Sequence, residues 1–229
     1  MVKIGCCGFP VSRKRYYREF NVVEVQKTFY RPPEKNTLER WRSEAPPDFE
    51  FVIKAWQLIT HPETSPTYRK AKVNYHDCGS FRDSECVNVG MEKTLACAEL
   101  LDAKIIIFQT PASFRESEES IKSIINFFRR FRTDQFIFGW EHRGTWSKDA
   151  LEYIYSETGL FEVVDPFKTE PLKTDFVYFR LHGVGGYRYR YTNEDLLRLK
   201  EYAECDGYIM FNNTNMFEDA KRFREMVSS

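Results

Sequence analysis

The feature that most constrains the fold is an alternation of short apolar runs with amphipathic stretches along the whole chain. Eight runs are rich in β-branched and aromatic residues and end in polar residues, as β-strands do. They span residues 3–8, 22–26, 49–55, 104–109, 135–143, 161–165, 176–183 and 208–213. Because helix-like stretches separate these runs, the sequence predicts a parallel sheet.

The helix-like stretches carry apolar residues at spacings of three and four. They span residues 37–44, 89–101, 117–131, 148–158, 193–203 and 217–227. Residues 11–20 leave room for a short helix at most, and residues 168–174 are too few and are interrupted by proline. The sequence therefore predicts an incomplete outer ring of helices. Residues 61–88 are rich in charges and turn residues. We interpret them as an excursion or lid over the barrel mouth that the carboxyl ends of the strands would form.

Eight parallel strands close most economically into a barrel. Residues 105–108 are apolar at consecutive positions, which is typical of parallel strands buried on both faces. With 229 residues, the chain fits one irregular (β/α)8 TIM-type barrel as a single domain over 1–229, since such barrels need about 250 residues. An open doubly wound sheet is the alternative, but no GxGxxG pattern follows the first strand.

Composition limits the function classes. The chain has 34 basic and 34 acidic residues, so its net charge is zero, which argues against non-specific nucleic-acid binding as its main task. Apolar residues make up 42% and aromatic residues 16%, enough for a core that needs neither disulfides nor metal. No stretch approaches the roughly 20 apolar residues of a membrane span, and we expect a cytoplasmic protein without membrane contact.

Polar residues at the strand ends are the candidate functional residues, because barrel enzymes place their chemistry at the carboxyl ends of the strands. Burying an unpaired charge costs several kcal/mol, so the sequence predicts that these side chains compensate one another at one barrel mouth. The residues selected by this rule are Cys6, Cys7, Glu24, Gln26, Lys54, Gln109, Glu141, Arg143, Asp165, Arg180, His182, Asn212 and Asn213.

Within this set, Glu141 and Asp165 are the candidate acid/base residues, with Arg143 and His182 setting their protonation. Two structural alternatives stay open at this point. Glu141 and Arg143 share one face of a strand and could serve only an internal salt bridge. Asp165 precedes a proline and could serve only to cap a turn.

An anion site is the second prediction from the strand ends. Lys54 and Arg180 supply cationic groups suited to a phosphate or carboxylate. The glycine-rich segment around Gly185 and the pair Asn212 and Asn213 precede predicted helices, where barrels often bind phosphate. The alternative is that these loop residues only form turns.

The six cysteines contain no CxxC pair, which excludes the usual zinc-ribbon and thioredoxin spacings. Cys78, Cys86 and Cys97 fall within twenty residues, so a disulfide, a metal or an iron–sulfur cluster is open, next to the plainer interpretation as small apolar residues. A divalent metal could also be held by carboxylates and a histidine. That set would be Glu24, Glu141, Asp165 and His182.

At these residues the chain resembles the YecE-like family, catalogued as domain of unknown function 72, over nearly its whole length. The resemblance lies in the segments 23–30, 51–55, 60–61, 108–111, 141–143, 164–165, 178–183 and 211–213. It implies an irregular TIM barrel and adds His61 to the polar mouth, without implying a reaction. The chain departs from the family pattern at Cys6-Cys7, where Thr-Ser is usual, and at Cys78, Cys86 and Cys97.

Three hypotheses for function follow. The first is an enzyme of hydrolase or lyase type that acts on a small anionic or phosphorylated substrate, since no cofactor fingerprint favours redox chemistry. The absence of a hydrolase elbow and of zinc-protease, P-loop and EF-hand motifs argues against the familiar hydrolase, kinase and protease mechanisms. The second is nucleic-acid processing, because tyrosine and arginine alternate over residues 187–191. The third is a non-catalytic module that binds a metabolite, a metal or an iron–sulfur cluster. The sequence does not indicate an oligomeric state.

Overall fold

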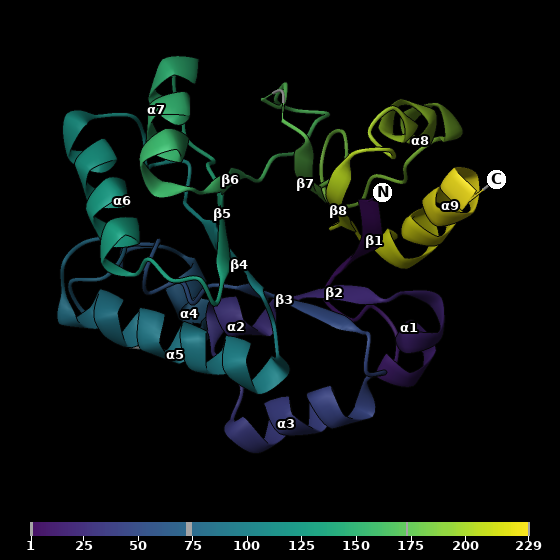
Figure 1. Cartoon of the computed structure of the whole chain (residues 1–229), viewed down its shortest axis with the longest axis horizontal. Coiled ribbons are helices and arrows are strands. Elements are labelled where there is room, and N and C mark those ends of the chain that lie inside the picture. The colour runs from purple at the N-terminus through teal and green to yellow at the C-terminus, as the bar shows by residue number, and fades with distance from the viewer. Residues whose placement is uncertain (1, 72–74, 173, 229) are drawn as a thin grey trace. The chain divides into compact units, whose positions relative to one another are not determined.

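The structure, a computed structural model, describes residues 2–71, 75–172 and 174–228, so residues 72–74 of the predicted excursion lie outside it. Its elements group into two units, each shown in Figure 1 with its labels. The first unit consists of Met1–Val25, Ser43–Phe51 and Glu162–Ser229, and the second of Gln26–Arg42 and Val52–Phe161. Strands β3 (Glu50–Lys54) and β6 (Phe161–Glu162) pass from one unit into the other.

Among its described residues, the first unit contains four further strands and three helices. The strands are β1 (Val2–Cys7), β2 (Val22–Val25), β7 (Phe176–Leu181) and β8 (Asp206–Phe211). The helices are α1 (Arg13–Glu19), α8 (Asn193–Lys200) and α9 (Met216–Ser228). Strand β1 pairs in parallel with both β2 and β8, and β8 pairs in parallel with β7. Ile209 of β8 lies between Ile4 and Phe179, so one apolar residue follows another across the sheet.

The second unit contains strands β4 (Ile105–Gln109) and β5 (Ile137–Glu141) beside the end of β3, all parallel. Its helices are α2 (Lys27–Tyr30), α3 (Lys35–Glu44), α4 (Thr67–Ala71), α5 (Glu85–Leu101), α6 (Glu118–Arg130) and α7 (Lys148–Thr158). The last two residues of α3, Ser43 and Glu44, belong to the first unit. Strand β4 is buried on both faces, as its uninterrupted apolar run predicts.

Local sequence explains where the long helices of the second unit begin. Ser84, Ser117 and Ser147 each precede a helix, and each side-chain oxygen accepts a hydrogen bond from the backbone N–H three residues on. α6 also has two glutamates in its first turn and two arginines in its last, which matches the helix dipole. These caps fix the loops that connect each strand end to the next helix.

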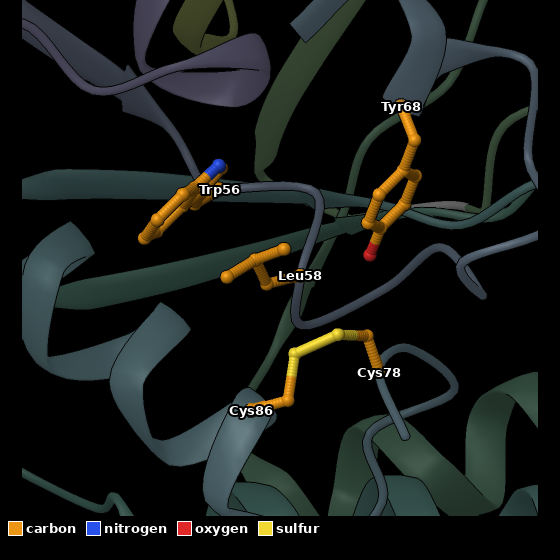
Figure 2. Packing of buried hydrophobic residues seen from close by; sticks show 5 residues of the cluster. All are labelled: Trp56, Leu58, Tyr68, Cys78 and Cys86. Carbon is orange, nitrogen blue, oxygen red and sulfur yellow. A yellow bond between two sulfur atoms is a disulfide. The ribbon is translucent and has the colours of Figure 1, made fainter. Parts of the chain in front are cut away.

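A separate apolar cluster holds the excursion in place within the second unit. It consists of Trp56, Leu58, Tyr68, Cys78 and Cys86, and Figure 2 shows the two cysteines joined by a disulfide beside Leu58. The excursion is therefore anchored by its own core. Its role as a lid stays a prediction.

The predicted elements and the observed ones agree closely. All eight predicted strands are present, with ends within about two residues of the predicted ones except for β6, which is shorter. The described part of the connection between β6 and β7 contains no helix, as predicted for an incomplete ring. Helices α2 and α4, of four and five residues, were not predicted.

Candidate functional site

In the second unit, the carboxyl ends of three adjacent strands bring together a compact polar group. Lys54 ends β3, Gln109 ends β4 and Glu141 ends β5, and Gln109 and Glu141 are register partners. The Lys54 ammonium donates to Gln109 Oε1 at 2.6 Å, and Arg143 Nε donates to Glu141 Oε1 at 2.8 Å. Lys54 is 5% and Glu141 4% exposed, so both charged groups are buried. Glu141 is paired with the Arg143 guanidinium, and the Lys54 ammonium is bound by the neutral amide oxygen of Gln109.

His61 joins this group from the start of the excursion. The ring of Phe29 contacts the His61 ring edge-on, with centroids 5.0 Å apart, and the Lys54 ammonium lies 3.9 Å from the centroid of the same Phe29 ring. Burial, and after it the charges of Lys54 and Arg143, lower the pKa of His61 to about 3, against the opposite effect of Glu141. His61 is therefore a neutral imidazole at ordinary pH.

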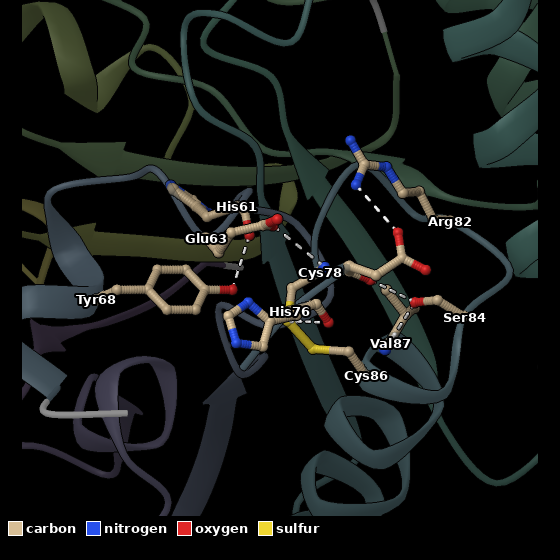
Figure 3. Close-up of a disulfide and its surroundings, with 10 residues drawn as sticks. His61, Glu63, Tyr68, His76, Cys78, Arg82, Ser84, Cys86 and Val87 are labelled. Atoms are coloured by element: carbon tan, nitrogen blue, oxygen red, sulfur yellow. Dashed lines mark hydrogen bonds and ion pairs between the residues drawn. A yellow bond between two sulfur atoms is a disulfide. The ribbon is translucent and has the colours of Figure 1, made fainter. Parts of the chain in front are cut away.

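The backbone around His61 is held by later residues of the excursion. The amides of Gly79 and Phe81 donate to the carbonyls of Leu58 and Ile59, and the Tyr68 hydroxyl donates to the His61 carbonyl at 2.9 Å. A Cβ on Gly79 would lie 2.3 Å from the His61 carbonyl carbon, so only glycine allows this approach. Figure 3 shows the Tyr68 hydroxyl directed to the His61 carbonyl, together with the Cys78–Cys86 disulfide.

The disulfide corrects one interpretation of the cysteines. Cys78 and Cys86 are bonded to each other, so they do not act with Cys97 as ligands of an iron–sulfur cluster or metal. Cys97 also lies eleven residues beyond Cys86 on α5, about 16 Å along the helix axis. It is 1% exposed, and burial raises the pKa of its thiol to about 11, which keeps it protonated.

In the first unit, Glu24 and Arg180 form a fully buried ion pair. Both side chains are 0% exposed, and Arg180 binds Glu24 through two contacts, Nε to Oε2 at 3.0 Å and Nη2 to Oε1 at 2.9 Å. The Tyr178 hydroxyl donates to the same Glu24 Oε2 at 2.9 Å. This bidentate ion pair links the ends of β2 and β7. Glu24 and Arg180, which were both predicted to contact substrate, bind each other here.

Asp165 and His182 form the second polar contact of this unit. The Asp165 carboxylate accepts the His182 amide at 2.9 Å, and the same oxygen lies 3.4 Å from His182 Nδ1 and 3.7 Å from the Lys168 ammonium. Its other oxygen accepts the Phe167 amide at 3.2 Å. Asp165 therefore caps the turn after β6 and contacts the histidine at once, so the two interpretations of this residue are compatible.

The predicted phosphate loops lie on the same unit. Gly185 is exposed, Asn212 is partly exposed, and Asn213 is 2% exposed. Asn213 Nδ2 donates to the Tyr189 carbonyl and to Asp219, each at 2.7 Å. Asp219 is 0% exposed and also accepts from Asn215 and Arg222, so it ties both loops to the start of α9.

The structure assigns the predicted residues to two groups, each defined within its own unit. Lys54, His61, Gln109, Glu141 and Arg143 are together in the second. Glu24, Asp165, Arg180, His182, Gly185, Asn212 and Asn213 belong to the first. That one mouth serves both groups stays a prediction. No set of three or more His, Cys, Asp or Glu side chains among the described residues is arranged to hold a metal ion.

Sequence reasoning missed several residues that position these groups. Phe29 supports both Lys54 and His61, Thr60 contacts the His61 ring, and Asp219 organises the loops after β7 and β8. Phe29 and Asp219 sit on helices, where an apolar or acidic residue ordinarily indicates core or solvent. Only Thr60, next to His61, gave a local signal.

The family model for "Protein of unknown function DUF72" matches residues 12–229. The chain belongs to the DUF72 family. Two solved DUF72 proteins match over the whole of this chain. The protein from Enterococcus faecalis is 17% identical, is itself covered over 96% of its length and has a TM-score of 0.75. The protein from Thermotoga maritima is 20% identical, is covered over 100% of its length and has a TM-score of 0.72.

Other solved structures extend the likeness beyond DUF72. D-psicose 3-epimerase from Clostridium cellulolyticum, solved with D-tagatose, matches over 99% of this chain and 98% of its own, with 9% identity and a TM-score of 0.61. At these identities the likeness shows the fold, so this DUF72 protein is an α/β TIM-type barrel. No curated protein matches the chain. No described helix is long and apolar enough to cross a membrane.

Proposed function

We propose that this DUF72 protein is an enzyme, of hydrolase or lyase type, that acts on a small anionic or phosphorylated compound. The observation that carries the proposal is the polar group of the second unit, where two cations and one carboxylate converge with His61 at the carboxyl ends of β3, β4 and β5. Most polar groups buried in a protein serve structure, but two cations beside a paired carboxylate are suited to binding an anion and moving a proton.

Each residue of this group has a proposed role. Lys54 and Arg143 bind the anionic part of the substrate, and Gln109 orients the Lys54 ammonium. Glu141 is the general base, because it is a buried carboxylate that Arg143 holds at the carboxyl end of β5. Asp165 and His182 stay proposed acid/base residues of the first unit, where their mutual contact suits proton transfer.

A turnover experiment tests this proposal. The protein is incubated with a metabolite extract, and mass spectrometry identifies small anions that are consumed. We expect the Glu141→Gln variant to keep its fold and to lose turnover by at least about 100-fold, the range typical of a general base. Glu152→Gln is the matched control, since Glu152 is an exposed residue of α7. Equal turnover in both variants, or a protein that binds anions and consumes none, would contradict an enzymatic role for Glu141.

A second candidate function is binding of single-stranded nucleic acid by the loop after β7. Tyr187 is 56% exposed, and Arg188 and Arg190 are exposed beside it, an arrangement that suits base stacking with phosphate contacts. Binding to a labelled oligothymidylate that weakens with salt and with Arg188→Gln and Arg190→Gln would support this function. Binding unaffected by these changes would count against it.

A cytoplasmic location is part of the main proposal. Disulfides are uncommon in reducing compartments, but Cys78 is 0% and Cys86 7% exposed. Burial restricts attack by an external thiol, so this disulfide can persist there. Cell fractionation would test the location, and alkylation of free thiols in the fraction that holds the protein would test the disulfide. Recovery of the protein outside the cytoplasm would refute the cytoplasmic location.

A further inference from the structure

The imidazole of His61 is a nearly buried polar group with one nitrogen left for a ligand. The side chain is 7% exposed, and Nδ1 lies 2.9 Å from the Thr60 hydroxyl oxygen. Among the described residues, none forms a hydrogen bond with His61 Nε2. Nε2 is therefore the ring atom left to bind a substrate group.

The contact with Thr60 determines which ring nitrogen carries the proton. Thr60 is 1% exposed, and within the described residues its hydroxyl has no other hydrogen-bond partner than the His61 ring. If the hydroxyl donates to Nδ1, both groups are satisfied, whereas a proton on Nδ1 would leave the hydroxyl hydrogen buried without an acceptor. The favoured tautomer therefore carries its proton on Nε2.

The surroundings keep this ring neutral. Lys54 and Arg143 both act against protonation of His61, and burial acts in the same direction and more strongly, so the pKa of about 3 lies far below the working range. Glu141 acts in the opposite direction and does not outweigh them. His61 is thus unsuited to release a proton as a general acid and suited to donate a hydrogen bond.

We propose that His61 donates a hydrogen bond from Nε2–H to a carbonyl or carboxylate oxygen of the substrate, and that Thr60 is the positioning residue that fixes its tautomer. This inference rests on the proposed function and narrows its substrate class. Two cations already attract the anionic part of the substrate, and a neutral donor adds direction without a third charge. The substrate is therefore a small anion that carries a carbonyl or carboxylate oxygen beside its charged group.

Nitrogen-15 NMR of the histidine rings tests the tautomer directly, with His61→Gln used to assign the signals. We expect His61 to show the Nε2–H tautomer and no titration between pH 5 and 8. Thr60→Val should convert the single tautomer into a mixture, which a residue with a merely structural role would not do. A His61 ring that titrates near pH 6, or that carries its proton on Nδ1, would overturn the inference.

Oxalate, a small dicarboxylate, is the binding probe. We expect His61→Leu to weaken oxalate binding by about tenfold or more, as loss of a charge-assisted hydrogen bond does, and His61→Gln, whose amide retains a donor, to weaken it by less than about threefold. His76→Gln is the control, because His76 is an exposed residue of the same excursion, and it should leave the affinity unchanged.

The outcomes separate this inference from the proposed function. If the wild-type protein binds neither oxalate nor inorganic phosphate, the anion site itself is refuted. If oxalate binds and His61→Leu binds it as tightly as the wild type, the anion site stands and the role of His61 is refuted. If inorganic phosphate moves the Nε2–H signal and oxalate does not, the substrate oxygen is phosphoryl rather than carbonyl, which also contradicts the inference.

Discussion

Removing the Cys78–Cys86 disulfide should destabilise the protein by a predictable amount and loosen the backbone that holds His61. The two cysteines are eight residues apart, and their bond closes a small loop. In the chain-entropy account, such a closure contributes about 2.5 kcal/mol by restricting the unfolded chain. The loop also includes Ser80 and Phe81 with positive φ, a backbone conformation that costs about 1–2 kcal/mol for each residue that is not glycine.

The double variant Cys78→Ala/Cys86→Ala tests this magnitude by urea unfolding. It removes two buried sulfurs as well as the cross-link, so Cys97→Ala serves as the matched control for the loss of one buried sulfur. We expect the double variant to lose about 2.5 kcal/mol beyond twice the loss in the control. In hydrogen exchange, the amides of Gly79 and Phe81 should exchange faster, because they donate to the 58–59 backbone.

The refuting result is equally definite. If the double variant loses no more than twice the free energy lost by Cys97→Ala, and the two amides keep their protection, the disulfide does not support the His61 segment. The apolar cluster of Trp56, Leu58 and Tyr68 alone would then hold it.

Three further predictions concern stability and are checked by chemical denaturation. Glu24→Gln should cost about 3–5 kcal/mol, because it leaves Arg180 as a buried charge without its carboxylate partner; a loss below 1 kcal/mol would contradict this. Gly79→Ala should destabilise the protein by several kcal/mol, because the added Cβ would meet the His61 backbone. Gly159 has φ +72 and nothing within 4 Å of an added Cβ, so Gly159→Ala should cost only about 1 kcal/mol. Equal losses in the two variants would be inconsistent with the close approach at Gly79. The pKa of His61 is about 6.5 in the unfolded chain and about 3 in the folded protein, so the unfolded chain binds the proton more readily. The free energy of unfolding should therefore fall as the pH drops from 6.5 toward 3, by at most about 5 kcal/mol. A pH profile of stability that His61→Gln does not flatten would refute this.

The strands were predictable because of their burial. Parallel strands covered on both faces require consecutive apolar residues, and β4 shows this directly in the sequence. Helices α2 and α4 were not predictable, since four or five residues give no 3.6-residue period. The polar residues at the strand ends were also predictable from burial, because a charged residue that interrupts a buried apolar run needs a partner.

The partners themselves were not predictable. Glu24 and Arg180 are 156 residues apart, and nothing local indicates that they bind each other rather than a substrate. Cys78 and Cys86 are close in sequence, but spacing alone does not separate a disulfide from a pair of metal ligands or from two apolar thiols. Phe29 became part of the site only through the fold, because an aromatic residue on a short helix ordinarily indicates core.

The most direct test of the anion site is calorimetric titration of oxalate into four proteins. These are the wild type, Lys54→Met, Arg143→Gln, and the control Lys104→Met, whose lysine lies just before β4 and is 68% exposed. The account predicts binding that Lys104→Met leaves unchanged and that Lys54→Met and Arg143→Gln each weaken by at least about tenfold. Equal affinity in all four proteins, or no binding by the wild type, would contradict the claim that Lys54 and Arg143 form an anion site.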